Sequence, residues 1–402
     1  MQPALLVLNV GSSSLKFSLF SILNADDLNL VLKGQIEILD DAFKFSVKNN
    51  ENKILLEKSI PSQKDLHKKA QAFALNTLLD YLKEKTTDYT ICAAGHRVVH
   101  GGNTFITPTM VNSQILMELE KLVPLAPLHQ PYNLEGIRTL NEYMPKLFQV
   151  ACFDTAFHAT QPDIAQAYAL PDDISSIPIK RYGFHGLSYE YIAQVAPRYL
   201  GSSEAEGKII VAHLGHGASL CAMRNRQSIA TTMGFTALEG LPMGTRCGNI
   251  DPGIILYLLH NGMSVENITE LLYTHSGLLG VSNISGDVRT LLSNTKPSAK
   301  KAIDLFIYRI QRELGSLVAA LEGLDSFIFT AGIGEHSPEI RARVCEKMNW
   351  LSLLIDDGAN QKNELKISRN NSKISAWVIP TNEEWIVAQH TLNLWKKTKD
   401  IV

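Results

Sequence analysis

The sequence predicts an α/β protein built from two similar domains, and three observations lead to this prediction. An apolar run over 5–8 turns through the polar segment 9–14 and returns as a second strand that contains Lys16. About half a chain later, the segment 209–220 repeats the same pattern of strand, glycine, short polar loop and strand. Stretches with helical spacing alternate with short β-rich runs in both halves. A supersecondary unit that recurs at such a distance indicates duplicated domains.

The composition restricts the class of protein and of partner. A chain of 402 residues with 45% hydrophobic residues can bury a separate core in each of two domains. Its 38 basic and 40 acidic residues leave a formal charge of -2, which favours a small-molecule partner over nucleic acid or an anionic membrane. Five scattered cysteines without a CxxC pair argue against disulfides and zinc. No signal peptide or membrane-spanning run is recognisable, so we expect a cytoplasmic protein.

The first half alternates strands and helices. Beyond the opening hairpin, alternating or β-rich character predicts strands over 30–38, 43–47 and 53–58, which continue the first sheet. Helical spacing over 65–82 predicts a helix with Asp65 as its N-cap. The pattern then predicts a strand over 90–94, helices over 113–122 and 133–143, and a strand over 147–152.

The second half follows the same plan. We predict strands over 209–214 and 219–223, helices over 253–259 and 265–273, and a long helix over 300–321 with a one-sided apolar stripe. A strand over 327–330 leads into a tight glycine turn at 331–335, and a helix over 384–397 ends the chain. We expect an N-terminal domain over 1–150, joined by the C-terminal helix 384–402, and a C-terminal domain over 151–383.

The opening hairpin has the composition of a phosphate-binding turn. Backbone N–H groups around Gly11, the hydroxyls of Ser12 and Ser14 and the cation of Lys16 come together at one point. A solvated serine-rich turn would explain the same residues equally well. The second hairpin, which ends in 213–219, favours the phosphate interpretation because it repeats the arrangement.

Several glycine-flanked cations and histidines follow predicted strands, where α/β proteins place their sites. They are Arg97 in 95–102, His129 in 124–131, Asp154 in 153–158, His185 in 181–186 and Arg246 in 240–248. Each alone is explained by a structural role or a surface ion pair. Together with two phosphate-type hairpins, they indicate a site for anionic ligands.

The chain resembles the acetate kinase family, short-chain acyl kinases of the sugar-kinase, actin and heat-shock-protein fold group. The matching segments lie in the family's order along nearly the whole chain, which makes the match specific: NVGSSSLK, GHRVVHGG, PLHQP, FDTAFH, RYGFHG, HLGHGAS, GLPMGTRCGNIDPG, FTAGIGEHSP and PTNEE. The resemblance implies two actin-like domains, with mixed sheets flanked by helices and a central cleft. It also implies reversible transfer of the ATP γ-phosphoryl group to acetate, and a homodimer.

The resemblance also implies roles for single residues. It makes Arg97, Asp154, His185 and Arg246 catalytic. It places Arg97, Val99, Leu128, His129 and Phe184 at the acyl substrate. It gives Mg²⁺, or Mn²⁺ in its place, the ligands Asn9 and Glu383. Because an acetate carboxylate is already ionised at neutral pH and attacks directly, Asp154 is expected to position groups or to support the metal rather than to accept a proton.

For ATP and ADP, the resemblance implies contacts from Ser12, Ser14, Lys16, His213, Leu214, Gly215, His216, Gly217, Asp287, Val288, Arg289, Gly332, Ile333, Gly334, Glu335 and His336. The chain departs from the family's usual residues at His216 and His336, where asparagine is common. It also departs at Asn249, where aspartate is frequent, and at Ala237, where proline is frequent. These departures bear on nucleotide and acyl specificity, because an imidazole cannot reproduce both ends of an amide.

Three alternatives stay open from the sequence. A propionate or other short-chain acyl kinase would share the fold and most of the site. A different phosphoryl donor is suggested by His216 and His336. A nucleotide-binding sensor without catalytic activity would also fit the fold, although it would not need Asn9, Arg97, Asp154, His185, Arg246 and Glu383 together.

Overall fold

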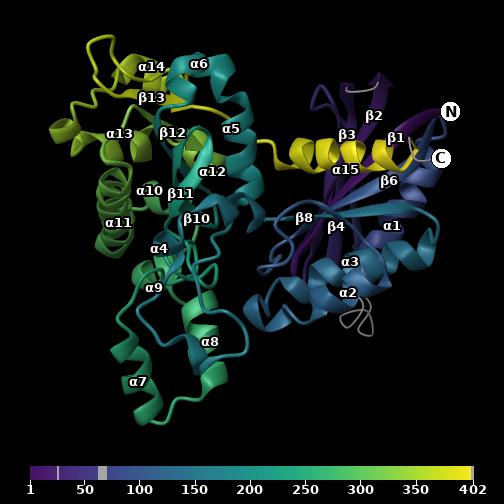
Figure 1. Cartoon of the computed structure of the whole chain (residues 1–402), viewed down its shortest axis with the longest axis horizontal. Helices are drawn as coiled ribbons and strands as arrows, with labels where there is room; N and C mark the ends of the chain where they lie inside the picture. The colour runs from purple at the N-terminus through teal and green to yellow at the C-terminus, as the bar shows by residue number, and fades with distance from the viewer. Residues whose placement is uncertain (25–26, 62–69, 400–402) are drawn as a thin grey trace. The chain divides into compact units, whose positions relative to one another are not determined.

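The computed structural model describes residues 1–24, 27–61 and 70–399. They form two compact units, shown in Figure 1. Unit 1 comprises Met1–Ala156 and Asn382–Val402, and unit 2 comprises Phe157–Thr381. Each unit has its own mixed β-sheet with packed helices, which confirms the predicted fold class.

The sheet of unit 1 combines a meander with a parallel half. Its strands lie in the order β5-β4-β3-β2-β1-β6-β8-β7. The bounds are β1 (Gln2–Val10), β2 (Ser14–Asn24), β3 (Asp27–Ile38), β4 (Ala42–Asn49), β5 (Ile54–Pro61), β6 (Tyr89–Val98), β7 (Thr109–Met110) and β8 (Phe148–Phe153). Strands β1 to β5 pair antiparallel, whereas β1, β6 and β8 run parallel to one another.

Helices cover both faces of this sheet. Within the described residues they are α1 (Ala70–Lys85), α2 (Ser113–Glu120), α3 (Gln130–Tyr143) and α15 (Glu383–Lys399). Leu6, Leu8 and Phe17 pack with Leu75 and Leu78 of α1 in the main core. On the opposite face, Leu5 and Ala93 pack with Leu392 of α15. The alternation of strand residues between these faces follows from the two-residue period of a strand.

The sheet of unit 2 is smaller, with the strand order β11-β10-β9-β12-β13. Its bounds are β9 (Lys208–Leu214), β10 (Ala218–Arg224), β11 (Gln227–Thr231), β12 (Ser326–Thr330) and β13 (Ser375–Val378). The helices are α4 (Asp163–Gln166), α5 (Gly186–Leu200), α6 (Ser202–Ala205), α7 (Pro252–His260), α8 (Val265–Thr274), α9 (Gly277–Ser282), α10 (Val288–Leu292), α11 (Pro297–Leu321), α12 (Ala331–His336), α13 (Pro338–Glu346) and α14 (Asp357–Gln361).

Helices α5 and α11 account for much of the core of unit 2. Tyr189 and Ile192 of α5 pack with Ile209 and Val211 of β9 and with Ile328 of β12. The 25-residue helix α11 packs against β9, β10 and β11 and carries the apolar stripe predicted for it.

The two sheets repeat one topology. The order β3-β2-β1-β6-β8 in unit 1 corresponds strand by strand to β11-β10-β9-β12-β13 in unit 2. In both, the first strand of a hairpin lies beside a parallel strand, and a second parallel strand follows outside it. The repeat detected in the sequence between the two hairpins is therefore a repeat of the central sheet.

Most predicted elements are present within a few residues of their expected ends. One prediction was wrong: 331–335 does not form a tight glycine turn but the helix α12, entered through Ala331 at φ 63°. The predicted N-cap Asp65 and the first residues of its helix lie outside the described residues. None of the helices in the described ranges combines the length and apolar character needed to cross a membrane.

Candidate active site

In unit 1, five polar side chains converge at the carboxyl ends of the parallel strands. Arg97 is the last but one residue of β6, Asp154 follows β8, and Glu383 begins α15, which packs on the same face as Arg97. Asn9 of β1 lies directly opposite Lys16 of β2 in the strand register. The two-residue period places Asn9 and Arg97 on the face that carries Leu5 and Ala93, which pack against α15.

Gly95 allows α15 to approach this face. A Cβ at Gly95 would lie 2.2 Å from Thr391 Oγ1 and 2.6 Å from Val387 Cγ1. Any side chain here would push α15 outward, and Glu383 with it. Gly95 therefore serves helix packing.

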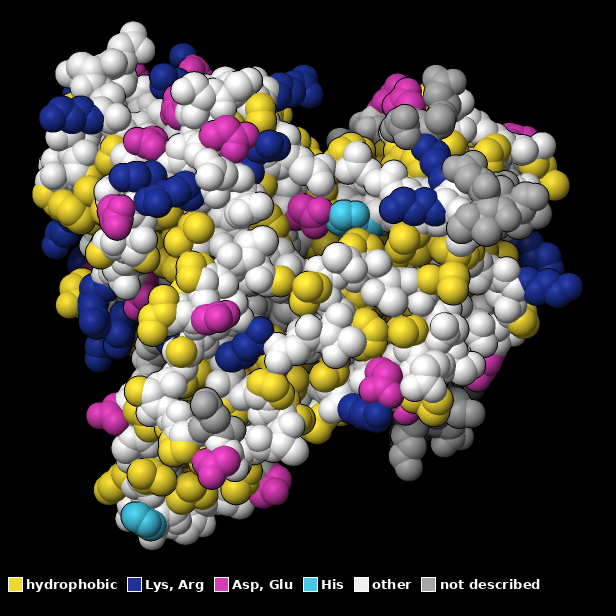
Figure 2. All heavy atoms as spheres, in the orientation of Figure 1, with side chains coloured by type: hydrophobic (Ala, Val, Ile, Leu, Met, Phe, Trp, Pro, Cys, Tyr) yellow, Lys and Arg dark blue, Asp and Glu magenta, His cyan; other side chains and the backbone are white. Residues whose placement is uncertain are grey.

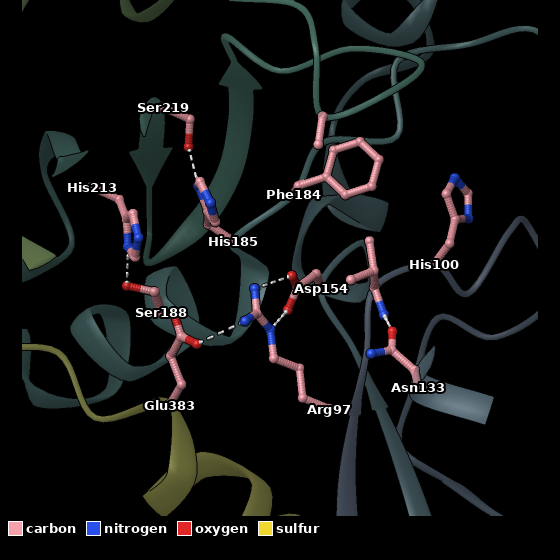
Figure 3. Close-up of polar contacts among 12 residues, drawn as sticks. Arg97, His100, Asn133, Asp154, Phe184, His185, Ser188, His213, Ser219 and Glu383 are labelled. Atoms are coloured by element: carbon pink, nitrogen blue, oxygen red, sulfur yellow. Dashed lines mark hydrogen bonds and ion pairs between the residues drawn. The ribbon is translucent and has the colours of Figure 1, made fainter. Parts of the chain in front are cut away.

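Asp154 fixes the orientation of Arg97, as Figure 3 shows. Arg97 Nε donates to Asp154 Oδ1 at 2.9 Å, and Nη2 donates to Oδ2 at 2.6 Å. Nη1 lies 3.7 Å from Glu383 Oε2. The Asp154 side chain is 2% exposed, whereas that of Arg97 is 22% exposed. A buried carboxylate thus holds the guanidinium fork while part of the cation stays accessible.

The charges in this cluster depend on one another. Burial would lower the pKa of Arg97, but the carboxylates of Asp154 and Glu383 outweigh burial and hold that pKa above its usual value. Burial raises the pKa of Glu383 to about 7, against the opposing effect of Arg97. The positive charge of Lys16 also acts to lower the pKa of Glu383, so Lys16 interacts electrostatically with this cluster.

The opening hairpin forms a tight turn with its polar groups outward. Gly11 N–H donates to the Ser14 carbonyl at 2.8 Å, which closes the turn. Ser12 and Lys16 are exposed, and Ser14 is partly exposed. Gln71 Nε2 of α1 donates to the Ser12 carbonyl at 2.9 Å. The hydroxyls and the lysine therefore remain available to a ligand.

The loop after β6 is held by two amides that sequence reasoning missed. Asn133 of α3 accepts from Val99 N–H at 2.9 Å and donates to the Val10 carbonyl at 2.7 Å. Gln130 accepts from His100 N–H at 3.1 Å and donates back to the His100 carbonyl at 3.0 Å. Both amides look like ordinary polar positions of a helix, so only the fold reveals their contacts.

The other predicted substrate residues differ in exposure. Val99 is buried, whereas Leu128 is 38% exposed. His129 is partly exposed and precedes the first residue of α3. Phe184, in unit 2, is buried at 2% exposure.

In unit 2, His185 and His213 form a stacked pair. Their ring centroids lie 4.2 Å apart with planes at 19°. His185 Nδ1 is 2.8 Å from Ser219 Oγ, and His213 Nδ1 is 2.8 Å from Ser188 Oγ (Figure 3). These serines orient both rings, and sequence reasoning had assigned them no role.

His185 has a left-handed backbone conformation, at φ 59°. Gly183 before it has φ 72°, and a Cβ there would lie 2.5 Å from the His158 ring. His158 Nε2 contacts the Phe184 carbonyl at 2.9 Å, and Nδ1 contacts Ser228 Oγ at 2.9 Å. His158 therefore supports the turn that presents His185, and burial lowers the pKa of His158 to about 4.

Arg246 lies in a loop that packs on the start of α9. Met243 N–H donates to the Arg246 carbonyl at 3.0 Å, and Arg246 Nη1 donates to the Ala237 carbonyl at 3.1 Å. The carbonyls of Met243 and Gly244 accept from Leu278 and Leu279 N–H. Burial, followed by the nearby charge of Arg246, lowers the pKa of His216.

A cavity of about 840 Å³ opens beside this loop. It is lined by eight of the residues predicted to bind the nucleotide: Gly215, His216, Asp287, Val288, Arg289, Gly332, Ile333 and His336. Hydrogen bonding to Arg289 lowers the pKa of Asp287 to about 2. A volume of this order suits a small-molecule ligand.

The remaining predicted nucleotide contacts of unit 2 do not line this cavity. Leu214 is fully buried. Gly217 lies against His185, and Gly334 packs against β12. Glu335 Oε1 accepts from Thr381 N–H at 3.1 Å, a structural contact within unit 2.

Arg341 anchors the wall of the cavity and was not anticipated. It is fully buried, and burial lowers its pKa to about 10. It donates to the Gly334 and Glu335 carbonyls at 2.8 and 3.0 Å, and to Asn360 and Asn363. It thus acts as a C-terminal cap for the short helix α12.

Comparisons with known proteins agree with this arrangement. The model of the acetokinase family matches residues 4–389. An acetate kinase of Rhodopseudomonas palustris strain TIE-1 is 48% identical over 98% of this chain and 99% of its own length. A propionate kinase structure from Francisella tularensis is 37% identical, with a TM-score of 0.87 over 97% of this chain and 99% of that one. An acetate kinase structure from Porphyromonas gingivalis is 34% identical, with a TM-score of 0.84 over 98% of this chain and 99% of that one.

Proposed function

This chain belongs to the acetokinase family, and we propose that it is an acetate kinase, which transfers the γ-phosphoryl group of ATP to acetate and forms acetyl phosphate and ADP. The observation that carries this proposal is the guanidinium of Arg97, held by Asp154 at the carboxyl end of a central strand. Such a fork is suited to bind a small carboxylate or a phosphoryl oxygen in two-point fashion.

The reaction needs alignment and neutralisation of charge more than proton transfer. Acetate is ionised at neutral pH, so its oxygen attacks phosphorus without a general base. Arg97 orients that carboxylate, and Arg246 and His185 neutralise the transferred phosphoryl group. Asp154 acts through Arg97, since both of its oxygens are occupied by that guanidinium.

Magnesium fits the donors of unit 1. The described residues contain no cluster of three or more His, Cys, Asp or Glu that could hold a metal by itself. Mg²⁺ commonly takes one or two protein oxygens and completes its shell with water and phosphate. Asn9 and Glu383 offer such oxygens, and Mn²⁺ suits the same set. The bound ion would lower the charge of the triphosphate.

The nucleotide is assigned to the 840 Å³ cavity. Ser12, Ser14 and Lys16 lie exposed or partly exposed on the opening turn of unit 1, so their hydroxyls and cation are available to phosphate groups. His213 of β9 and Gly215 belong to the corresponding hairpin of unit 2. Asp287 and Arg289 are hydrogen-bonded to each other and both line the cavity.

A trapping experiment tests the activity. With acetate, Mg·ATP and hydroxylamine, we expect acetohydroxamate that requires all three components and disappears with excess chelator. ATP hydrolysis at a rate that does not depend on acetate would contradict the proposal, and so would the absence of hydroxamate. Binding of ATP with neither hydroxamate nor ATP turnover would favour the sensor alternative.

Propionate is the second candidate substrate, because the structural neighbour with 37% identity is a propionate kinase. One methylene in an apolar pocket changes binding by about 1–3 kcal/mol, or roughly 10- to 200-fold. We expect kcat/KM to favour acetate over propionate and butyrate within that range. A preference for propionate would reverse the assignment.

We further propose that two copies of this chain associate through α7. None of the nine residues of α7 is buried, although the helix is strongly apolar. Ile254, Leu256, Tyr257 and Leu259 are 48%, 57%, 66% and 38% exposed, and Val265 of α8 is 64% exposed. Figure 2 shows hydrophobic side chains at the end of unit 2 where α7 lies.

Area and charge favour a second copy as the occupant. Side chains of this kind present roughly 150–200 Å² each when exposed, so the patch offers about 450 Å² of apolar surface. That matches the apolar share of a standard interface of about 800 Å² per partner. The helix contains no Asp, Glu, Lys or Arg, so two copies meet there without like-charge repulsion.

Mass determination in solution tests this interface. We expect a dimer at micromolar concentration, and a monomer for the L256E/Y257E variant. Y308E is the matched control, since Tyr308 on α11 is also exposed, at 56%, and should leave the dimer intact. A monomeric native chain would overturn the proposal, and a dimeric L256E/Y257E variant would place the interface elsewhere.

A further inference from the structure

The loop that carries Arg246 is closed at its base by Asn249. The backbone N–H of Asn249 donates to the Gly240 carbonyl at 2.9 Å. In return, the Gly240 N–H donates to the side-chain Oδ1 of Asn249 at 2.8 Å. Asn249 therefore joins the two ends of the segment 240–249 by a reciprocal pair of hydrogen bonds.

The other end of the same amide reaches α11. Asn249 Nδ2 donates to Glu313 Oε1 at 3.2 Å. The Gly240 N–H needs an acceptor, so the amide oxygen must face Gly240 and the NH₂ group must face Glu313. The contact with Glu313 therefore requires a donor, and asparagine supplies a donor and an acceptor at once.

The two ends of the segment 240–249 are so closely packed that neither can move without displacing the other. Gly248 has φ 69°, and a Cβ there would lie 2.5 Å from the Leu241 carbonyl carbon and 2.6 Å from the Gly240 oxygen. Gly240 has φ 104°, and its Cβ would lie 2.7 Å from the Thr232 oxygen. A shift of Asn249 would therefore move both Gly240 and Gly248.

Such a shift would reach Arg246, three residues away. The Arg246 carbonyl accepts from Met243 N–H across the loop, and its guanidinium donates to the Ala237 carbonyl just before the base. The far end of the loop is fixed separately, because Ser276 N–H donates to the Thr245 carbonyl at 2.9 Å. The orientation of Arg246 thus depends on two sets of contacts, those of Asn249 with Gly240 and that of Thr245 with Ser276.

We propose that Asn249 is a positioning residue for Arg246, and that Glu313 determines that this residue must be an amide. The inference rests on the proposed phosphoryl-transfer function, because it deepens the role of Arg246 in it. An aspartate, the nearest isostere, could still accept from Gly240. Its second oxygen would then lie at hydrogen-bond distance from the Glu313 carboxylate. The two negative charges would repel each other, because no hydrogen bond could form between them.

A double-mutant cycle tests the pair. We expect N249D to lower kcat at least tenfold with little change in the KM for ATP, since the nucleotide cavity is not altered. E313Q alone keeps an acceptor for Asn249 and should change kcat less than twofold. In N249D/E313Q the amide introduced at position 313 can donate to the aspartate, so most of the lost kcat should return.

Rescue separates positioning from general damage to the fold. The proposal is wrong if N249D keeps native kcat. It is also wrong if N249D/E313Q has no higher kcat than N249D although all variants have the melting temperature of the native protein. R246A is measured in parallel. Native turnover in R246A would refute the role of Arg246 itself, whereas a strong loss in R246A beside an unaffected N249D would refute only the positioning by Asn249.

Discussion

The imidazole of His185 stacks on that of His213 with ring centroids 4.2 Å apart, and each ring is hydrogen-bonded to its own buried serine. Stacked and tethered rings have little freedom to reorient, so the edge of His185 that is not bonded to Ser219 has a defined direction. If His185 is catalytic, as proposed, this arrangement reduces the free-energy cost of orienting its ring.

His185 combines a proposed catalytic role with a left-handed backbone, and two substitutions separate these. Asparagine tolerates the left-handed region, whereas alanine costs about 1–2 kcal/mol there. We expect H185N to be more stable than H185A by about 1–2 kcal/mol and to lose about 100-fold in kcat. H185A should lose similar activity and also unfold more readily in urea. Equal stability of the two variants would contradict the strain argument.

Removal of the negative charge at Asp154 should disable Arg97. In D154N, one oxygen acceptor becomes an NH₂ group that faces the guanidinium donors. We expect kcat to fall by about 100- to 1000-fold, as for other groups that hold a transition-state cation. The control is E120Q, which alters the exposed pair between Arg138 and Glu120 and should leave the rate unchanged. Native turnover in D154N would refute the assigned role.

Two buried histidines make stability depend on pH. Burial lowers the pKa values of His96 and His158 to about 4, against about 6.5 in the unfolded chain. Between pH 6.5 and 4, the unfolded state therefore binds more protons, and the free energy of unfolding falls as pH falls. Each histidine contributes a slope of up to about 1.4 kcal/mol per pH unit.

Urea titrations from pH 7.5 to 4.5 check this dependence. H96Q and H158Q should each reduce the slope of stability against pH by about one proton relative to the native chain. Comparison with the native slope removes the contribution of the carboxylates, which all proteins share. An unchanged slope in both variants would show that folding does not lower the pKa values of these two rings.

Gly95 and Gly315 offer a matched pair of glycine substitutions. G95A places a methyl group against Thr391 and Val387 of α15, which should cost about 1–3 kcal/mol as overpacking and lower kcat through Glu383. G315A, in the middle of α11, meets nothing within 4 Å and should stabilise the protein by about 0.5–1 kcal/mol. Calorimetry and steady-state rates distinguish the two.

Local signals were sufficient for most of the secondary structure. The two hairpins, the amphipathic stripe of α11 and the strands that precede Arg97 and Asp154 follow from residue spacing alone. The segment 331–335 is the instructive exception, because its glycines favour a turn in isolation. Arg341 of the next helix caps its carbonyls, and this tertiary contact outweighs the low helix propensity of glycine.

The sequence by itself determined the family and the fold class, and it proposed the residues of the candidate site, since these depend on spacing and on motifs along the chain. Only the tertiary structure decided that Asp154 holds Arg97, that Ser188 and Ser219 orient the two histidines, and that Asn249 lies between Gly240 and Glu313. These contacts join residues 9 to 64 positions apart. Hydrogen bonds across such separations depend on how strands and helices pack, and residue spacing carries no record of that packing.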